Sequence, residues 1–160
     1  MRIIRATPEY TNGITKAQFS AYEAVNDHNP SARSETASNI ESRIMDESWR
    51  VFIGINDDNE VITSISYLLN HQKDAAYACR WFSIGKGLAA YYIFIDSMNQ
   101  LRTEGIRRLF ARTFKVDRRV KIYKRGRFRE ASSEEITECK LMVRDIIPSM
   151  EDRIYLVRDL

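Results

Sequence analysis

The sequence lacks a hydrophobic run long enough to cross a membrane. Its longest uninterrupted apolar stretch, residues 88–95, covers eight residues, whereas a transmembrane helix needs about 20. The first residues also lack the apolar core of a secretory signal. We therefore expect an intracellular, cytoplasmic protein that has no membrane partner.

Cysteine, glycine and proline are also scarce, at 2, 6 and 3 of 160 residues. Cys79 and Cys139 show no metal-ligand spacing, and two thiols in a reducing compartment stay free by default. We therefore expect neither a metal site nor a disulfide. With 44% hydrophobic and 29% charged residues, the composition excludes disordered and fibrous proteins, and the length suits one domain.

Positive charge is distributed unevenly along the chain. Residues 102–129 contain twelve Lys or Arg against two acidic residues, which gives this segment +10 and leaves −7 for the rest of a chain whose net charge is +3. A local excess of this size favours a polyanionic partner. Coenzyme A, with its pyrophosphate and ribose phosphate, qualifies as readily as a nucleic acid does.

Apolar spacing and turn signals predict the order of the elements. They indicate, in chain order, a strand at 1–6, a helix capped by Thr7 that ends near Pro30, a helix capped by Ser34, strands at 49–55, 61–69 and 75–83, a helix at 88–104, a strand at 106–114, a helix capped by Asp117, and strands at 127–131 and 137–145. This order predicts a mixed α/β fold with one central sheet covered by helices on both faces. We divide the chain into a domain at 1–148 and a C-terminal strand or tail at 149–160.

The most informative stretch is a glycine-containing turn that leads into the helix at 88–104. It consists of Ile84, Gly85, Lys86, Gly87, Leu88 and Ala89. Glycine lets the backbone turn tightly and approach an anion, while the unpaired N–H groups and positive dipole end of the following helix favour a phosphate. Taken alone, a plain structural turn explains these residues equally well.

This turn resembles the pyrophosphate loop of the GNAT superfamily of acetyl-CoA-dependent acetyltransferases, commonly written Arg/Gln-x-x-Gly-x-Gly/Ala. Gly87 and Ala89 fill the two small positions, and Gly85 and Lys86 agree with a frequent form of the loop. Ile84 replaces the leading Arg or Gln, so one side chain that would face the ligand is absent.

A second stretch, at residues 120–128, is similar to the helix-to-strand signature Tyr-x-x-x-Gly-Phe of the same family. Tyr123 and Phe128 are in register, whereas Arg127 stands at the glycine position and Gly126 is displaced by one residue. The order of the predicted elements agrees with the family over about residues 1–147. The resemblance implies a GNAT-like mixed, mostly antiparallel sheet with helices on both faces.

The resemblance also implies a reaction and a set of roles. In GNAT enzymes an acceptor amine attacks the thioester of acetyl-CoA within a ternary complex, without a covalent acyl-enzyme. By resemblance, the backbone of Cys79, Arg80 and Trp81 binds the pantetheine arm, residues 84–89 bind the pyrophosphate, and Tyr123 protonates the departing thiolate. The alternative for Tyr123 is a packing role on the apolar face of its helix. Basic residues at 118–125 lie where family members often meet nucleotide phosphates, or form a solvated helix face.

The general base is not assigned. The strand at 75–83, which often carries a Glu in this family, contains no carboxylate beyond Asp74 at its edge. His71 and His28 lie in polar stretches, and we interpret both as solvated loop residues. A water relay from a backbone carbonyl or a distant carboxylate stays open.

Three functions compete on this reading. The first is an N-acetyltransferase that transfers an acetyl group from acetyl-CoA to a primary amine of a small molecule or protein. The second is a non-catalytic GNAT-fold protein with a binding, regulatory or assembly role, which Ile84 and Arg127 favour. The third, a nucleic-acid-binding module, rests only on the basic segment, and because the sequence carries no recognised nucleic-acid motif we do not expect this partner. The acceptor is not identified, and a homodimer stays open.

Overall fold

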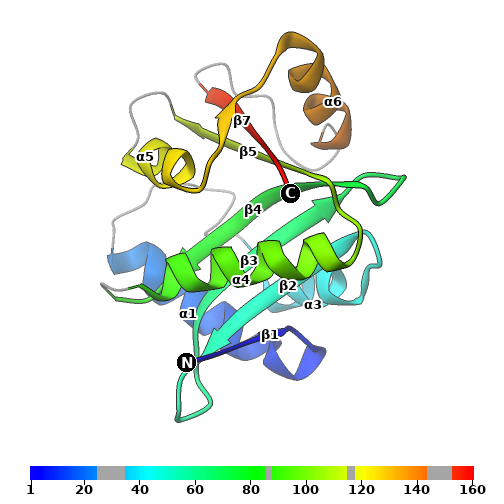
Figure 1. Ribbon diagram of the computed structural model, residues 1–160. Coiled ribbons are helices and arrows are strands. Elements are labelled where there is room, and N and C mark those ends of the chain that lie inside the picture. Colours follow the sequence, from blue (N-terminus) through cyan, green and yellow to red (C-terminus); the bar gives the residue numbers. More distant parts are fainter. Residues whose placement is uncertain (25–34, 86–87, 115–117, 144–152) are drawn as a thin grey trace. The chain divides into compact units, whose positions relative to one another are not determined.

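The structure is a computed structural model that describes residues 1–24, 35–85, 88–114, 118–143 and 153–160 (Figure 1). Its strands are β1 (Arg2–Arg5), β2 (Trp49–Ile55), β3 (Val61–Leu69), β4 (Ala75–Ser83), β5 (Arg108–Phe114), β6 (Arg129–Glu130) and β7 (Arg153–Asp159). Its helices are the 3₁₀ turn η1 (Pro8–Tyr10) and the α-helices α1 (Thr11–Ala24), α3 (Ala37–Met45), α4 (Ala89–Thr103), α5 (Arg118–Arg125) and α6 (Ser133–Val143).

The strands of the described residues form a mixed, mostly antiparallel sheet with the order β1-β2-β3-β4-β5-β7-β6. β1 pairs antiparallel with β2, and β7 pairs antiparallel with both β5 and β6. β4 and β5 are parallel, as expected for two strands joined by a helical crossover, here α4. The predicted sheet type is therefore confirmed.

The chain divides into two compact units. The first comprises Met1–Tyr67 and Arg80–Met98, and the second comprises Leu68–Cys79 and Asn99–Leu160.

The core of the first unit is built on the alternation of side chains along β2. Val51, Ile53 and Ile55 belong to a buried cluster that includes Ile14 of α1 and Ile40 of α3. Successive residues of a strand point to opposite faces, so Phe52 points to the other face, against which α4 packs. Helices therefore pack on both faces of this part of the sheet, as the sequence predicted.

The opposite face of the first unit packs against α4. The ring of Phe52 lies edge-on to Tyr67 with centroids 5.9 Å apart, and the Tyr67 and Ser97 hydroxyls are hydrogen-bonded at 2.7 Å. Phe94 of α4 stacks on Trp81 of β4. A buried hydroxyl is costly without a partner, so the Tyr67–Ser97 hydrogen bond favours the packing of α4 against β3.

The helix α3 begins two residues later than predicted. The side chain of Thr36 accepts a hydrogen bond from the Asn39 amide, while the Asn39 side chain accepts one from the Thr36 amide. This reciprocal capping box satisfies two N–H groups at the helix start. The predicted cap, Ser34, lies outside the described residues, as does the predicted cap of α5, Asp117.

The second unit is centred on the long pairing of β5 with β7. Their register runs from Arg108 opposite Asp159 to Phe114 opposite Arg153, and the buried side chains of both strands form its core. This core includes Leu109, Phe110, Ala111, Leu156 and Val157, all with no exposed surface. The segment at 149–160, predicted as a strand or tail, thus contains β7.

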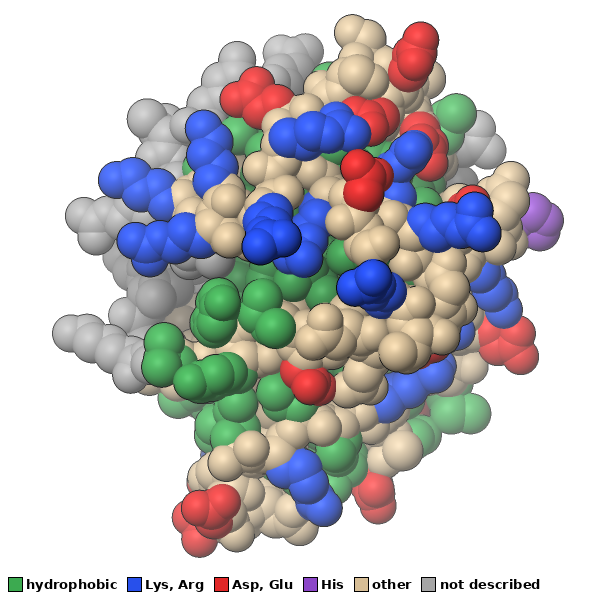
Figure 2. All heavy atoms as spheres, in the orientation of Figure 1, with side chains coloured by type: hydrophobic (Ala, Val, Ile, Leu, Met, Phe, Trp, Pro, Cys, Tyr) green, Lys and Arg blue, Asp and Glu red, His purple; other side chains and the backbone are tan. Residues whose placement is uncertain are grey.

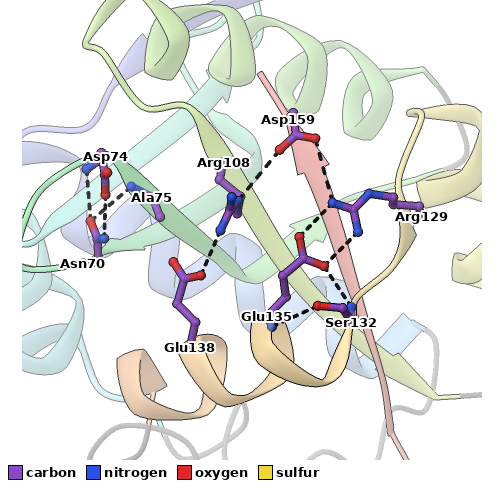
Figure 3. Close-up of polar contacts among 9 residues, drawn as sticks. All are labelled: Asn70, Asp74, Ala75, Arg108, Arg129, Ser132, Glu135, Glu138 and Asp159. Carbon is purple, nitrogen blue, oxygen red and sulfur yellow. Dashed lines mark hydrogen bonds and ion pairs between the residues drawn. The ribbon is translucent and has the colours of Figure 1, made fainter.

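The segment predicted as a strand at 137–145 is helical through Val143. It belongs to α6, whose start is fixed by a capping box: the Ser132 amide donates to the Glu135 carboxylate at 2.8 Å, and the Glu135 amide donates to the Ser132 hydroxyl at 3.3 Å (Figure 3). Cys139 and Val143, four residues apart, are its buried positions. The Ser-x-x-Glu signature that the sequence carries at 132–135 is a helix signal, and the strand prediction overlooked it.

No helix in the described ranges combines the length and apolar character that crossing a membrane requires.

Candidate functional site

The first candidate feature is the place where the pairing of β4 with β5 ends. The parallel register covers three residue pairs, from Ala75 opposite Arg108 to Tyr77 opposite Phe110. Three residues further along β4, Arg80 adopts φ +50°, a left-handed conformation that costs a non-glycine residue about 1–2 kcal/mol. Irregular strand backbone of this kind often lies beside functional sites. This is the stretch from which the sequence predicted backbone contacts to a pantetheine arm.

The side chains of this stretch are engaged in packing and ion pairing. Cys79 is half-buried, and the indole of Trp81 stacks on Phe94 with ring centroids 4.9 Å apart. The Nε of Arg80 lies 3.4 Å from a carboxylate oxygen of Glu35. The side chains of Arg80 and Trp81 therefore make contacts within the protein, and the sequence predicted ligand contacts from the backbone groups of this stretch.

A buried charge cluster beside Arg80 was not foreseen. The Glu35 side chain is only 3% exposed and forms an ion pair with Arg43, whose side chain is 10% exposed. Arg43 also lies over the ring of Trp49 and donates to the Ser66 hydroxyl at 3.3 Å. Nothing in the sequence indicates this cluster, because its charged members are separated by up to 45 positions and only the fold brings them together.

The predicted glycine turn does connect a strand to a helix. The Ile84 amide donates to the carbonyl of Ile62 at 2.8 Å, and Gly85 has φ +78° with no atom near the position of a Cβ. Glycine is thus favoured at 85 by backbone conformation. Leu88 is exposed and its carbonyl accepts from the Tyr92 amide as α4 begins at Ala89. Lys86 and Gly87 lie outside the described residues.

Tyr123 and Phe128, the two matched residues of the second motif, are in contact. Their rings lie edge to face with centroids 5.3 Å apart, and the Phe128 amide donates to the Tyr123 carbonyl at 3.0 Å. Both side chains are buried. Arg127, at the position where the family signature has glycine, adopts φ +62°. The turn therefore keeps the conformation that favours glycine although the residue is an arginine.

A second buried tyrosine, Tyr77, lies on β4 in the same unit as Tyr123. Burial raises the pKa of the Tyr77 phenol well above its ordinary value, and the neighbouring Cys79 and Tyr123 act in the same direction while Arg112 opposes them. Tyr77 therefore stays protonated at any physiological pH. No signal in the sequence distinguished Tyr77 from the other apolar residues of its strand.

Among the described residues, the strand at 75–83, where the family often has a Glu, carries no carboxylate that could act as the base. Asp74 belongs to the β3–β4 turn, where its carboxylate accepts from the Asn70 side chain at 2.7 Å (Figure 3). His71 is exposed in the same turn. His28 lies outside the described residues. The general base accordingly stays unassigned.

The described part of the basic segment exposes several of its cations on the surface of the second unit. Lys and Arg side chains gather over α5, β6 and β7 (Figure 2). Lys121, Lys124 and Arg125 on α5 are exposed. Acidic partners balance part of this charge, because Arg108 donates to Glu138 at 2.9 Å and Arg129 donates to Glu135 at 2.8 and 2.7 Å (Figure 3).

Comparison with known proteins gives matches in structure only. A scan against protein families and a search of curated proteins found no match to the sequence. Among solved structures, the chain is similar to a GNAT-family acetyltransferase from Staphylococcus aureus Mu50, at 15% identity and a TM-score of 0.69 over 99% of this chain and 98% of that one. It is similar to PaiA N-acetyltransferase from Thermoplasma acidophilum in complex with coenzyme A, at 8% identity and a TM-score of 0.75 over the same shares. It also resembles aminoglycoside 6′-N-acetyltransferase from Enterococcus faecium, at 8% identity and a TM-score of 0.71 over 99% and 97% of the two chains. From β1 to β7, this chain has the fold of the GNAT acetyltransferases.

Proposed function

We propose that this protein is an N-acetyltransferase that transfers the acetyl group of acetyl-CoA to a primary amine of a small molecule or protein. The observation that carries the proposal is the end of the β4–β5 pairing after Tyr77 and Phe110, followed by the left-handed Arg80. It occurs within a fold for which a similar structure, PaiA from Thermoplasma acidophilum, is a complex with coenzyme A.

The cofactor role follows from backbone chemistry. In this proposal the backbone of Cys79, Arg80 and Trp81 hydrogen-bonds the amides of the pantetheine arm, as a neighbouring strand would. The turn at 84–89 holds the pyrophosphate, because the first N–H groups of α4 have no acceptor within the helix and its dipole favours an anion. Side chains along β4 are occupied elsewhere, as the stacking of Trp81 on Phe94 illustrates.

The chemistry is a direct transfer. The neutral amine nitrogen attacks the carbonyl carbon of the thioester, a C–N bond forms, and the C–S bond breaks. The amine gives up a proton to a base or to water, and the departing thiolate takes a proton from the phenol of Tyr123. A positioned acid of this kind contributes about 100-fold to 10,000-fold to the rate. The edge-to-face contact with Phe128 holds the Tyr123 ring in one orientation.

Two measurements test this proposal in sequence. Calorimetric titration with acetyl-CoA should give saturable heat at a stoichiometry of one per chain. Release of free thiol with a panel of primary amines then tests for transfer, with protein omitted and amine omitted as controls. Absence of saturable heat would end the acetyltransferase proposal at its first step.

A non-catalytic GNAT-fold protein is the second candidate. The observation that favours it is Ile84, an exposed apolar side chain where the family's loop pattern has Arg or Gln. If the protein is non-catalytic, we expect it to bind acetyl-CoA but to release no thiol with any amine tested. An enzyme whose acceptor is missing from the panel should still hydrolyse bound acetyl-CoA slowly, since the intact transfer chemistry would let water act as a poor acceptor. The non-catalytic protein should not hydrolyse it.

A further inference from the structure

Four arginines surround a hollow in the second unit. Arg102, Arg127, Arg129 and Arg158 line it together with one acid, Asp159, and two apolar residues, and we call it the arginine hollow. Its volume is about 370 Å³, within the range of about 300–1,000 Å³ that small-molecule sites occupy. The side chains of the lining therefore carry three more positive than negative charges around a space of ligand size.

Two of these guanidinium groups are held by the protein. Arg129 is paired in both arms with the carboxylate of Glu135, and Arg158 donates to the backbone carbonyl of Gly126 at 2.6 Å. For the side chains of Arg102 and Arg127, both exposed, the described part of the chain provides no ion pair and no hydrogen bond. The hollow thus combines two fixed cations with two that are available to a ligand.

The cations are close enough to repel one another. The pKa of Arg158 is lowered from its ordinary value by partial burial and then by the positive charges of Arg127 and Arg102. Like charges that converge in this way destabilise a protein unless an anion neutralises them. An anion in the hollow would contact donors from three separate segments of the chain.

The backbone conformation of Arg127 also supports a ligand site at the arginine hollow. α4 and α5 end in the same motif, in which the amide of the second residue after the helix donates three positions back and the next amide donates five positions back. These residues are Gly105 and Ile106 for α4, and Arg127 and Phe128 for α5. The second residue after the helix has φ +91° for α4, at Gly105, and +62° for α5, at Arg127. Glycine is the favoured residue there, yet α5 uses an arginine whose side chain lines the hollow. Strained non-glycine residues of this kind concentrate at ligand sites.

We propose that the arginine hollow binds a small molecule that carries a diphosphate group. The planar guanidinium fork matches phosphate oxygens in a two-pronged geometry, and Arg102 and Arg127 provide two such forks for two phosphates. A single carboxylate would engage only one of these two forks. Arg102 lies in the last turn of α4, whereas the turn that we assign to acetyl-CoA leads into its first turn, so the site is additional to the proposed cofactor site.

The experiment measures binding of inorganic pyrophosphate by calorimetry at fixed ionic strength. Pyrophosphate should bind wild-type protein with saturable heat, and Arg102→Gln and Arg127→Gly should each weaken binding about tenfold or more, because each removes a charge-assisted contact. Arg125→Gln is the matched control, since Arg125 is exposed on α5 and outside the hollow; it should change the affinity less than twofold. Arg127→Gly also favours the native backbone, so lost binding in this variant does not reflect unfolding.

Three results would overturn the proposal. The first is equal pyrophosphate affinity in wild type, Arg102→Gln and Arg127→Gly, which would place the anion elsewhere, the glycine turn included. The second is equal or tighter binding of citrate, which would assign the hollow to carboxylates. The third is tighter binding of a short single-stranded oligonucleotide that Arg125→Gln weakens as much as Arg102→Gln does, which would indicate an extended nucleic-acid surface. None of these depends on whether acetyl-CoA binds, so the two proposals fail separately.

Discussion

At the scale of single residues, the ends of α4 and α5 form a natural comparison. Both helices end in one hydrogen-bonding motif, with Gly105 after α4 and Arg127 after α5, and both residues have positive φ. A side chain at such a position costs about 1–2 kcal/mol relative to glycine. In the sequence, Gly126 stands one residue before the glycine position of the family signature, so either Gly126 or Arg127 could occupy the left-handed position of the turn. The structure places Arg127 there.

We predict that Arg127→Gly raises the free energy of unfolding by about 1 kcal/mol, because it relieves the left-handed conformation. Urea unfolding followed by circular dichroism measures the change. Gly105→Ala is the reciprocal control and should lower the free energy of unfolding by about 1 kcal/mol. A loss of stability in Arg127→Gly would show that the arginine side chain contributes more to folding than its backbone costs.

Tyr123 is the residue on which the proposed chemistry depends most. Tyr123→Phe removes only the hydroxyl, so the edge-to-face contact with Phe128 and the fold should persist. If the phenol donates a proton to the thiolate, turnover should fall about 100-fold or more, while acetyl-CoA affinity stays nearly unchanged. Thiol release and calorimetry measure the two quantities on the same preparation.

The matched control for this prediction is Tyr155→Phe, which removes a hydroxyl from β7 in the same unit. It should leave turnover within about twofold of wild type. Equal turnover of Tyr123→Phe and wild type would assign Tyr123 a packing role only, which is the alternative that the apolar face of its helix offers.

At the scale of elements, α6 shows how a local signal can be overlooked and still decide the structure. The apolar residues of 137–145 allow a strand, but Ser132 and Glu135 close a capping box at the helix start. The box satisfies two amides that a strand would have to pair with a neighbour. Capping chemistry within four residues therefore outweighed the spacing of the apolar side chains that follow.

The capping box also predicts a pH dependence. The hydrogen bond from Arg129, and next the one from the Ser132 amide, hold the pKa of the Glu135 carboxyl at about 2, below its ordinary value of 4.5. A carboxyl whose pKa is lower in the folded state stabilises the fold above its ordinary pKa and loses this effect as the pH falls toward the folded pKa. Wild-type protein should therefore exceed Glu135→Gln in stability at pH 6, and the gap should close between about pH 4.5 and pH 2.

Urea midpoints of the two proteins at a series of pH values measure this gap. Glu134→Gln, one residue earlier and exposed, is the control and should show a smaller gap that changes less with pH. A gap for Glu135→Gln that stays constant down to pH 2 would contradict the proposed role of the ionised carboxylate.

At the scale of the whole molecule, contacts between distant segments define the candidate sites. Glu35 precedes α3, Arg43 lies within α3, and Arg80 lies on β4, yet the three form one ion cluster in the first unit. Removing one partner from a buried ion pair leaves an uncompensated charge and typically costs about 3–5 kcal/mol. The cluster thus fixes the irregular backbone of β4 at Arg80 to the start of α3.

We predict that Glu35→Gln lowers the free energy of unfolding by about 3 kcal/mol, because Arg43 and Arg80 lose their buried counter-charge. Equilibrium unfolding in urea measures the loss. Glu41→Gln, on the exposed side of α3, is the control and should change stability by less than about 0.5 kcal/mol. Similar effects of the two substitutions would mean that the cluster contributes nothing beyond a surface ion pair.

The sequence by itself determined most of the elements and the type of sheet. The predicted strands 61–69 and 75–83 coincide with β3 and β4, and the predicted glycine turn leads into α4. These features are local, because side-chain periodicity, turn residues and helix caps act over a few positions of the chain. The motif residues Tyr123 and Phe128 could be paired for the same reason, since they are five positions apart.

Only the tertiary structure decided where β4 parts from β5, which charges are buried around Glu35, and which arginines meet in the arginine hollow. Arg102, Arg129 and Arg158 come from α4, β6 and β7, and a count of charges along the chain cannot group them. The physical reason is that burial and Coulomb interactions depend on distance in space, and the packing of elements far apart in the sequence sets those distances.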